Sequence, residues 1–97
     1  MTEIFLHIAT PAGGRIGAAL ARACARAGVA WSCFLTNDGV RALADPAVVA
    51  ALKAATRATV CEHSWRQYMN ETPCPVELGS QTVNSALMAE VRHVISL

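Results

Sequence analysis

Charged side chains are scarce in this sequence, since Asp, Glu, Lys and Arg make up only 15% of its 97 residues. Globular domains carry about 25%. The net charge is +1, and no basic stripe with interleaved aromatic residues is present, which argues against nucleic acid as the main ligand. A small chain with so few charges has little polar surface, and we therefore expect it to associate with copies of itself or with partners.

Long apolar runs are also missing. None reaches the about 18 residues typical of a membrane-spanning helix, because Arg22 and Arg26 interrupt the longest candidate. No basic segment precedes the first apolar run and Glu3 comes early, so the N-terminus does not resemble a signal peptide. These features predict a cytoplasmic protein without a membrane span. The length predicts a single domain over residues 1–97.

The four cysteines, at positions 24, 33, 61 and 74, form no C-x-x-C pair. Without such close ligand pairs a structural zinc site is not expected. Without an export signal the thiols are expected to stay reduced. A recognisable Ser-His-Asp set, paired catalytic carboxylates and the glycine motifs of nucleotide-binding loops are missing as well. We therefore expect no metal and no cofactor.

What the sequence does contain is an alternation of β-favouring apolar runs and helical patterns. The first run is almost entirely apolar, which is typical of a strand buried on both faces of a parallel sheet. The expected strands cover residues 3–9, 29–36, 58–61, 76–78 and 92–97. Helical spacing and capping residues predict helical segments over 15–27, 40–44, 46–55, 64–70 and 80–90.

This alternation predicts an α/β protein with a three-layer Rossmann-like fold around a five-stranded, mainly parallel sheet. With right-handed crossovers we expect the flavodoxin-like strand order 2-1-3-4-5. In that order the first and third strands are neighbours, and the ligand crevice lies beyond their carboxyl ends. The crevice would then bring Cys61 close to a glycine-bearing loop that contains Thr10, Gly13 and Gly14.

Cys61 ends the third expected strand, directly before a helical pattern. A helix N-terminus supplies positive potential, and positive potential favours the thiolate, which is the reactive form of cysteine. His63 and Arg66 would add to this potential, Glu62 would oppose it, and Ser64 is the expected N-cap. The alternative is that Cys61 is a small buried hydrophobe, as free cysteines often are.

Several segments, taken in order, resemble the small DsrE/DsrF/DsrH-like proteins of sulfur relay systems. They are the loop and helix over 10–28, the strand ending Phe34-Leu35-Thr36-Asn37-Asp38-Gly39-Val40, Val60-Cys61, and the last helix and strand over 78–97. Val60-Cys61 matches the strand ending that holds a sulfur-accepting cysteine in that family. The resemblance implies a Rossmann-like fold, persulfide transfer at Cys61, and homo- or hetero-oligomers such as trimers or hexamers. The helix after Cys61 departs from the family, whose members often have small residues there followed by Arg-Gly.

Two functions follow from these observations. In the first, the protein is a sulfur carrier that accepts sulfane sulfur on Cys61 from a donor protein and passes it to an acceptor thiol, with support from His63, Ser64 and Arg66. In the second, it is a non-catalytic subunit or binding module of the same fold, with Trp65 and Tyr68 at an interface.

Cys74 lies between Pro73 and Pro75, in a segment expected to be exposed or at a sheet edge. It is either a loop thiol or a resolving thiol for Cys61. The second role requires the two Cα atoms to lie within about 7 Å of each other.

Overall fold

The computed structural model describes residues 2–97. Five strands form one sheet in which every neighbouring pair is parallel: β1 (Ile4–Ile8), β2 (Trp31–Leu35), β3 (Arg57–Cys61), β4 (Glu77–Gly79) and β5 (His93–Ser96). They are connected by α1 (Pro11–Ala27), the 3₁₀ helix η1 (Asn37–Ala44), α2 (Pro46–Leu52), α3 (Glu62–Met69) and α4 (Gln81–Ala89). The predicted α/β class, with a five-stranded parallel sheet, is confirmed.

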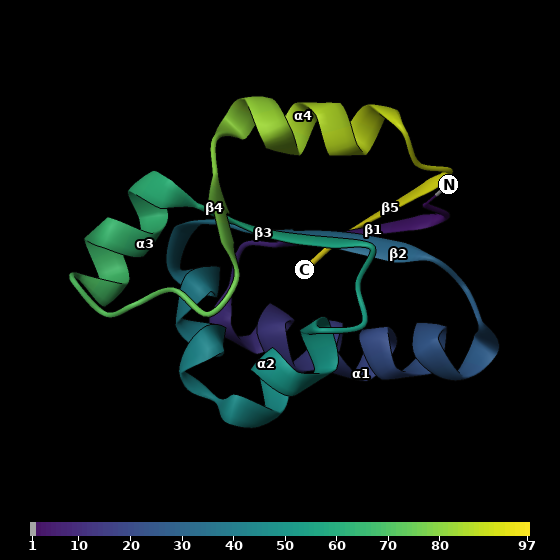
Figure 1. The fold of residues 1–97 in the computed structure, drawn as a ribbon, viewed down its shortest axis with the longest axis horizontal. Helices are drawn as coiled ribbons and strands as arrows, with labels where there is room; N and C mark the ends of the chain where they lie inside the picture. Colours follow the sequence, from purple (N-terminus) through teal and green to yellow (C-terminus); the bar gives the residue numbers. More distant parts are fainter. Residues whose placement is uncertain (1) are drawn as a thin grey trace.

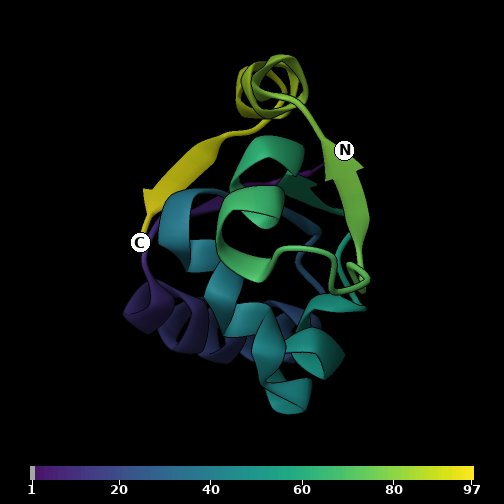
Figure 2. The ribbon, with the colours of Figure 1, turned by 90° about the vertical axis from the view of Figure 1, so that its left-hand side faces the viewer.

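The predicted order of the strands is wrong. The observed order is β4-β3-β2-β1-β5, so that β2 separates β1 from β3. The chain advances in one direction from β1 to β4, and only the connection through α4 turns back to place β5 beside β1. Right-handed crossovers place helices on opposite faces when the direction reverses. Accordingly, α1 and α2 cover one face of the sheet and α4 covers the other (Figure 1). Figure 2 shows β4 and β5 at opposite edges.

Side chains alternate between two hydrophobic clusters of unequal size. The larger one, on the face of α1 and α2, contains Trp31 and Leu35 of β2 and Val60 of β3. The smaller one lies under α4 and is formed by Phe5, Phe34, Cys61 and Leu87, with Val83 and Val91 packed against it. Val83 and Leu87 are thus the side chains by which α4 packs on the sheet. No helix within residues 2–97 is both long and apolar enough to cross a membrane.

The N-terminus of α1 differs from the prediction, which placed a loop up to Gly14. Thr10 is the N-cap, and its hydroxyl accepts a hydrogen bond from the Gly13 N–H at 2.9 Å. Pro11 follows at the first helical position, where its missing N–H is not needed. The two glycines thus lie inside the helix. A Cβ on Gly14 would lie 2.1 Å from the Cβ of Ala42, so glycine lets α1 approach η1 closely.

The Gly14→Ala variant should lower the free energy of unfolding by about 1–3 kcal/mol, the usual cost of overpacking a core. The cause is the overlap with Ala42, which would push α1 and η1 apart. Urea denaturation measures the change. Adding Ala42→Gly removes the obstructing methyl group and should restore part of the loss. A double variant no more stable than Gly14→Ala alone would contradict this explanation.

Candidate functional site

Cys61 is the last residue of β3 and occupies the N-cap position of α3, which begins at Glu62. The predicted strand–helix junction is confirmed. The side chain is 6% exposed and contacts the small cluster under α4. In the sheet its neighbour is Gly79 of β4, where an added Cβ would lie 2.5 Å from Cγ2 of Thr59. Glycine at this position therefore allows β4 and the start of α4 to lie close to β3.

Polar side chains, of which Thr36, Ser64 and Asn84 are buried, connect the ends of β2, β3 and β4 around this cysteine. The Ser64 hydroxyl accepts a hydrogen bond from the Asn37 N–H at 2.9 Å and lies 3.4 Å from the Thr36 hydroxyl. Gln81 Nε2 donates to Thr36 Oγ1 at 3.3 Å, and Asn84 Nδ2 donates to Gln81 Oε1 at 3.3 Å. Since Ser64 Oγ already accepts from a backbone N–H, its own proton is available for a second partner.

Ser64 therefore has a different role from the predicted one. It lies in the first turn of α3 and does not cap the helix, because α3 starts two residues earlier than expected and its hydroxyl accepts from Asn37. Cys61 makes no capping hydrogen bond with its side chain either. Neither side chain therefore caps α3. The polar groups near the sulfur instead favour the thiolate form of Cys61.

The pKa of Cys61 reflects two opposing influences. Burial raises the pKa, while the hydroxyl and backbone N–H of Ser64, and then the side chains of Thr36 and Gln81, lower it by hydrogen bonding to the thiolate. The donors prevail, and the pKa of Cys61 lies below its ordinary value. By contrast, burial raises the pKa of Cys33 to about 12, and a backbone hydrogen bond from Thr59 offsets this only in part. Burial also raises the pKa of Cys74.

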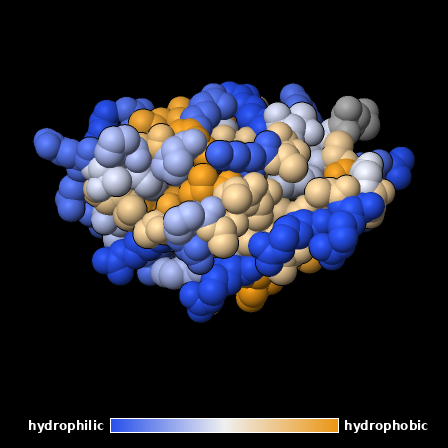
Figure 3. Space-filling model, turned by 60° about the horizontal axis from the view of Figure 1, so that its bottom comes forward, coloured by the Kyte–Doolittle hydropathy of each residue, from blue (hydrophilic) through white to orange (hydrophobic). Residues whose placement is uncertain are grey.

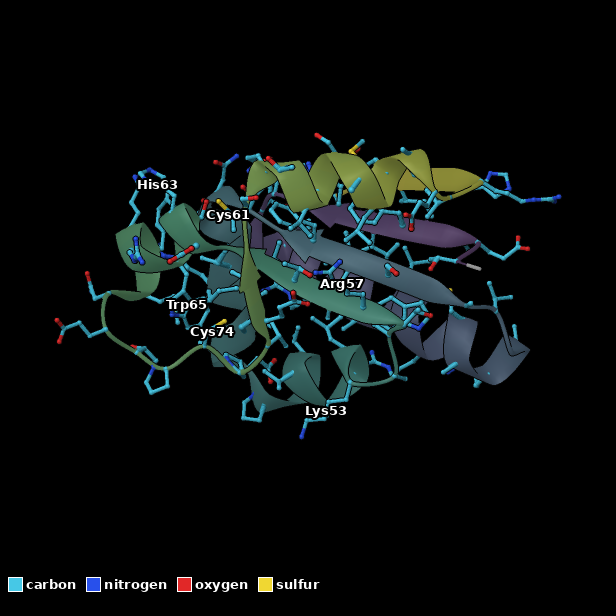
Figure 4. All side chains as sticks on the ribbon, turned by 45° about the horizontal axis from the view of Figure 1, so that its top comes forward. Lys53, Arg57, Cys61, His63, Trp65 and Cys74 are labelled. Carbon is cyan, nitrogen blue, oxygen red and sulfur yellow. The ribbon has the colours of Figure 1, made fainter. Side chains whose placement is uncertain are left out.

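A pocket of about 270 Å³ opens onto Cys61. Its walls come from the first turn of α3 and from the junction of β4 with α4. They include Glu62, His63, Arg66 and Gln81. Glu62 and Arg66 form an ion pair one helical turn apart, so each charge is largely neutralised by the other. His63 is exposed and projects away from the helix, whereas Cys61 lies between the starts of α3 and α4 (Figure 4).

The pairing of Glu62 with Arg66 changes two expectations. Glu62 is not among the groups that shift the pKa of Cys61, so the predicted opposition between them is not found. Arg66 lines the pocket, but its guanidinium is bound to Glu62 and its side chain is 73% exposed. Of the predicted supporting residues in α3, Ser64 therefore has the most direct influence on the sulfur.

The structure does not bring Thr10, Gly13 and Gly14 to this site. They begin α1 beyond the end of β1, and β2 lies between β1 and β3. A Cβ on Gly13 would lie 2.5 Å from the carbonyl oxygen of Leu97, so Gly13 serves close packing against the C-terminal strand. The prediction failed because it rested on the wrong strand order. With the observed order, the residues after β2 take this place, and these include Thr36.

Thr36, Gln81 and Asn84 are the polar residues that sequence reasoning missed. Thr36 directly follows a buried strand, and the two amides lie in the first turns of the last helix. Both positions are at the carboxyl ends of parallel strands, where ligand sites of α/β proteins form. Their location after the strands could have identified these residues from the sequence. To connect them with Cys61, however, one must know which strands are neighbours.

The remaining candidates lie apart from the pocket. Cys74 packs against the larger cluster, on the opposite face of the sheet from Cys61, and both thiols are free. This arrangement does not support a resolving role for Cys74. Trp65 is 4% exposed and Tyr68 is half-buried, so both rings pack against the larger cluster, and this arrangement does not support an interface formed by them.

Comparison with known proteins gives no matching family model and no matching curated protein. Within residues 2–97, no group of three or more His, Cys, Asp or Glu side chains is placed to hold a metal ion.

Removal of the Ser64 hydroxyl should raise the pKa of Cys61, because that hydroxyl is the strongest of the groups that lower it. In the Ser64→Ala variant the midpoint of the alkylation rate against pH should move upward. Gln81→Met should move it in the same direction by less. Ser80 lines the same pocket but does not influence this pKa, so Ser80→Ala is the matched control. Identical midpoints for Ser64→Ala and Ser80→Ala would disprove the assigned cause.

Proposed function

We propose that the protein is a sulfur relay protein that carries sulfane sulfur as a persulfide on Cys61. The observation that supports this most is the position of one cysteine with a lowered pKa at the wall of an open pocket, at the carboxyl end of the sheet. Thiol exchange is fastest when the pKa of the attacking thiol is near the ambient pH. Lowering the pKa of Cys61 moves it in that direction.

The first step is attack of the Cys61 thiolate on the outer sulfur of a donor persulfide. A new S–S bond forms to Cys61, the S–S bond of the donor breaks, and the donor leaves as a thiolate that takes up a proton. In the second step an acceptor thiolate attacks the outer sulfur on Cys61 and releases the Cys61 thiolate. Neither step is a net oxidation or reduction, so no oxidant, reductant or redox cofactor is needed.

Groups around the pocket fit particular parts of this exchange. Ser64, Thr36 and Gln81 lower the pKa of Cys61, so they favour Cys61 both as the attacking thiolate and as the leaving group of the second step. His63 is exposed at the pocket wall, where an imidazole can carry the proton to or from the partner thiol. The small pocket volume and its open shape favour delivery of sulfur by the exposed cysteine of another protein. A reducing compartment such as the cytoplasm suits the four free thiols.

Incubation with a persulfide donor should add one sulfur atom to the intact protein, and the added sulfur should be removed by a thiol such as dithiothreitol. Cys61→Ser should abolish this gain in mass. Cys33→Ser and Cys74→Ser should retain it, because burial raises the pKa of both thiols. Labelling of Cys74 instead of Cys61, or no labelling at all, would refute the carrier role. Slow alkylation of Cys61 together with no labelling would favour the non-catalytic module.

We further propose that the chain assembles into a homo-oligomer or with related subunits. Support comes from the low charge content and from the exposed apolar side chains Leu78, Met88 and Val94 on β4, α4 and β5. Sedimentation at micromolar concentration should therefore show a species larger than the 10.2 kDa chain. Met88→Lys together with Val94→Lys should shift that species toward the monomer. A single monomeric species of the unmodified protein would contradict the proposal.

A further inference from the structure

A second and larger hollow, of about 590 Å³, lies away from the Cys61 pocket and shares no residue with it. One wall is formed by η1 and α2 and includes Leu43, Val49 and Ala50. The other wall is formed by α3 and the loop after it and includes Trp65 and Met69. Figure 3 brings the face with α1 and α2 forward and shows hydrophobic surface between hydrophilic residues. The volume is in the range of about 300–1,000 Å³ that is typical of small-molecule sites.

The two walls are fixed to each other and to the core, so this groove exists before any ligand binds. Trp65 Nε1 donates to the carbonyl oxygen of Thr72 at 2.7 Å, which fastens the loop to α3. The Arg41 guanidinium lies over the Tyr68 ring, 5.4 Å from its centroid, which fastens η1 to the same helix. Prolines in both walls further restrict the backbone. A preformed apolar site loses little entropy when it binds a ligand.

Charge selects among apolar ligands at this groove. Lys53 is the one charged residue in its lining, and no acidic residue lines it. The salt bridges within residues 2–97 are Arg57–Glu77 and Glu62–Arg66, which leaves Lys53 without an acidic partner. Figure 4 shows Lys53 projecting into solvent from the end of α2. A ligand whose apolar part fills the groove can therefore present an anionic end to this ammonium group.

We propose that the groove binds an apolar molecule that ends in a single carboxylate, such as a medium-length acyl chain. The chain would lie between the two walls, in contact with Leu43, Val49 and Met69 and with the exposed atoms of Trp65, and the carboxylate would lie at the mouth beside Lys53. This site is separate from Cys61 and does not depend on sulfur transfer. The Cys61→Ser variant should therefore bind the same ligand as tightly as the unmodified protein.

Calorimetric titration of the full chain with decanoate, below the concentration at which decanoate forms micelles, tests the proposal. Saturable binding of one molecule per chain is expected, with a change in the fluorescence of Trp65. Octanoate should bind about 15-fold more weakly, because each buried methylene contributes about 0.8 kcal/mol, or about fourfold in Kd. The absence of saturable binding, or equal affinity for the two acids, would overturn the proposal.

Two pairs of variants locate the ligand and its charge. Ala50→Glu places a carboxylate in the groove and should weaken decanoate binding at least about tenfold, while Ala47→Glu, on the same helix but outside the groove, should not. Lys53→Met should weaken decanoate up to about fivefold, as expected for an exposed ion pair, and should leave decanol unchanged. Equal effects of the two glutamates, or equal affinity of the unmodified protein for decanol and decanoate, would refute this assignment.

Discussion

The hydrogen bond from the Asn37 N–H to the Ser64 hydroxyl connects the end of β2 to the first turn of α3. The rest of the site depends on it. Asn37 adopts a left-handed conformation, with φ of 51°, which asparagine tolerates better than most residues. Ser64 is 4% exposed, so its hydroxyl is a fixed, buried acceptor for the Asn37 N–H, and its loss would remove this link between β2 and α3. This bond also leaves the Ser64 proton free to act on the sulfur of Cys61.

The strand order determines which groups can reach that sulfur. Because β2, β3 and β4 are neighbours, their carboxyl ends form one continuous edge that contains Thr36, Cys61 and Gly79. Helix α4 begins directly after β4, at the same edge, so its first residue, Gln81, lies close to Thr36 and donates to its hydroxyl. Positively charged side chains are not needed for the lowered pKa. Neutral donors held in place by the sheet stabilise the thiolate, which agrees with the scarcity of charge in the sequence.

Local sequence patterns predict the strands and helices of this structure, but they do not determine which strands are neighbours. Apolar runs and capping residues predicted five strands and five helical segments, and they placed Cys61 at a strand–helix junction. Right-handed crossovers are compatible with several strand orders, and the preference for 2-1-3-4-5 placed the wrong loop beside Cys61. Thr36 and Gln81 were missed for that reason. The predicted start of α3 lies two residues too far along the chain, because serine is a typical N-cap residue. The hydroxyl of Ser64 instead makes a tertiary contact with Asn37.

Helix α3 forms a wall of both the Cys61 pocket and the apolar groove. It has only eight residues, and helices this short are not stable by themselves in water. Its position must therefore come from tertiary contacts, and these lie at both ends. Ser64 holds the first turn to β2, while Trp65 and Tyr68 bind the following loop and η1. Glu62, His63 and Arg66 thus line the Cys61 pocket, whereas Trp65 and Met69 of the same helix line the groove. A shift of this helix would change the donors around the sulfur and the width of the groove together.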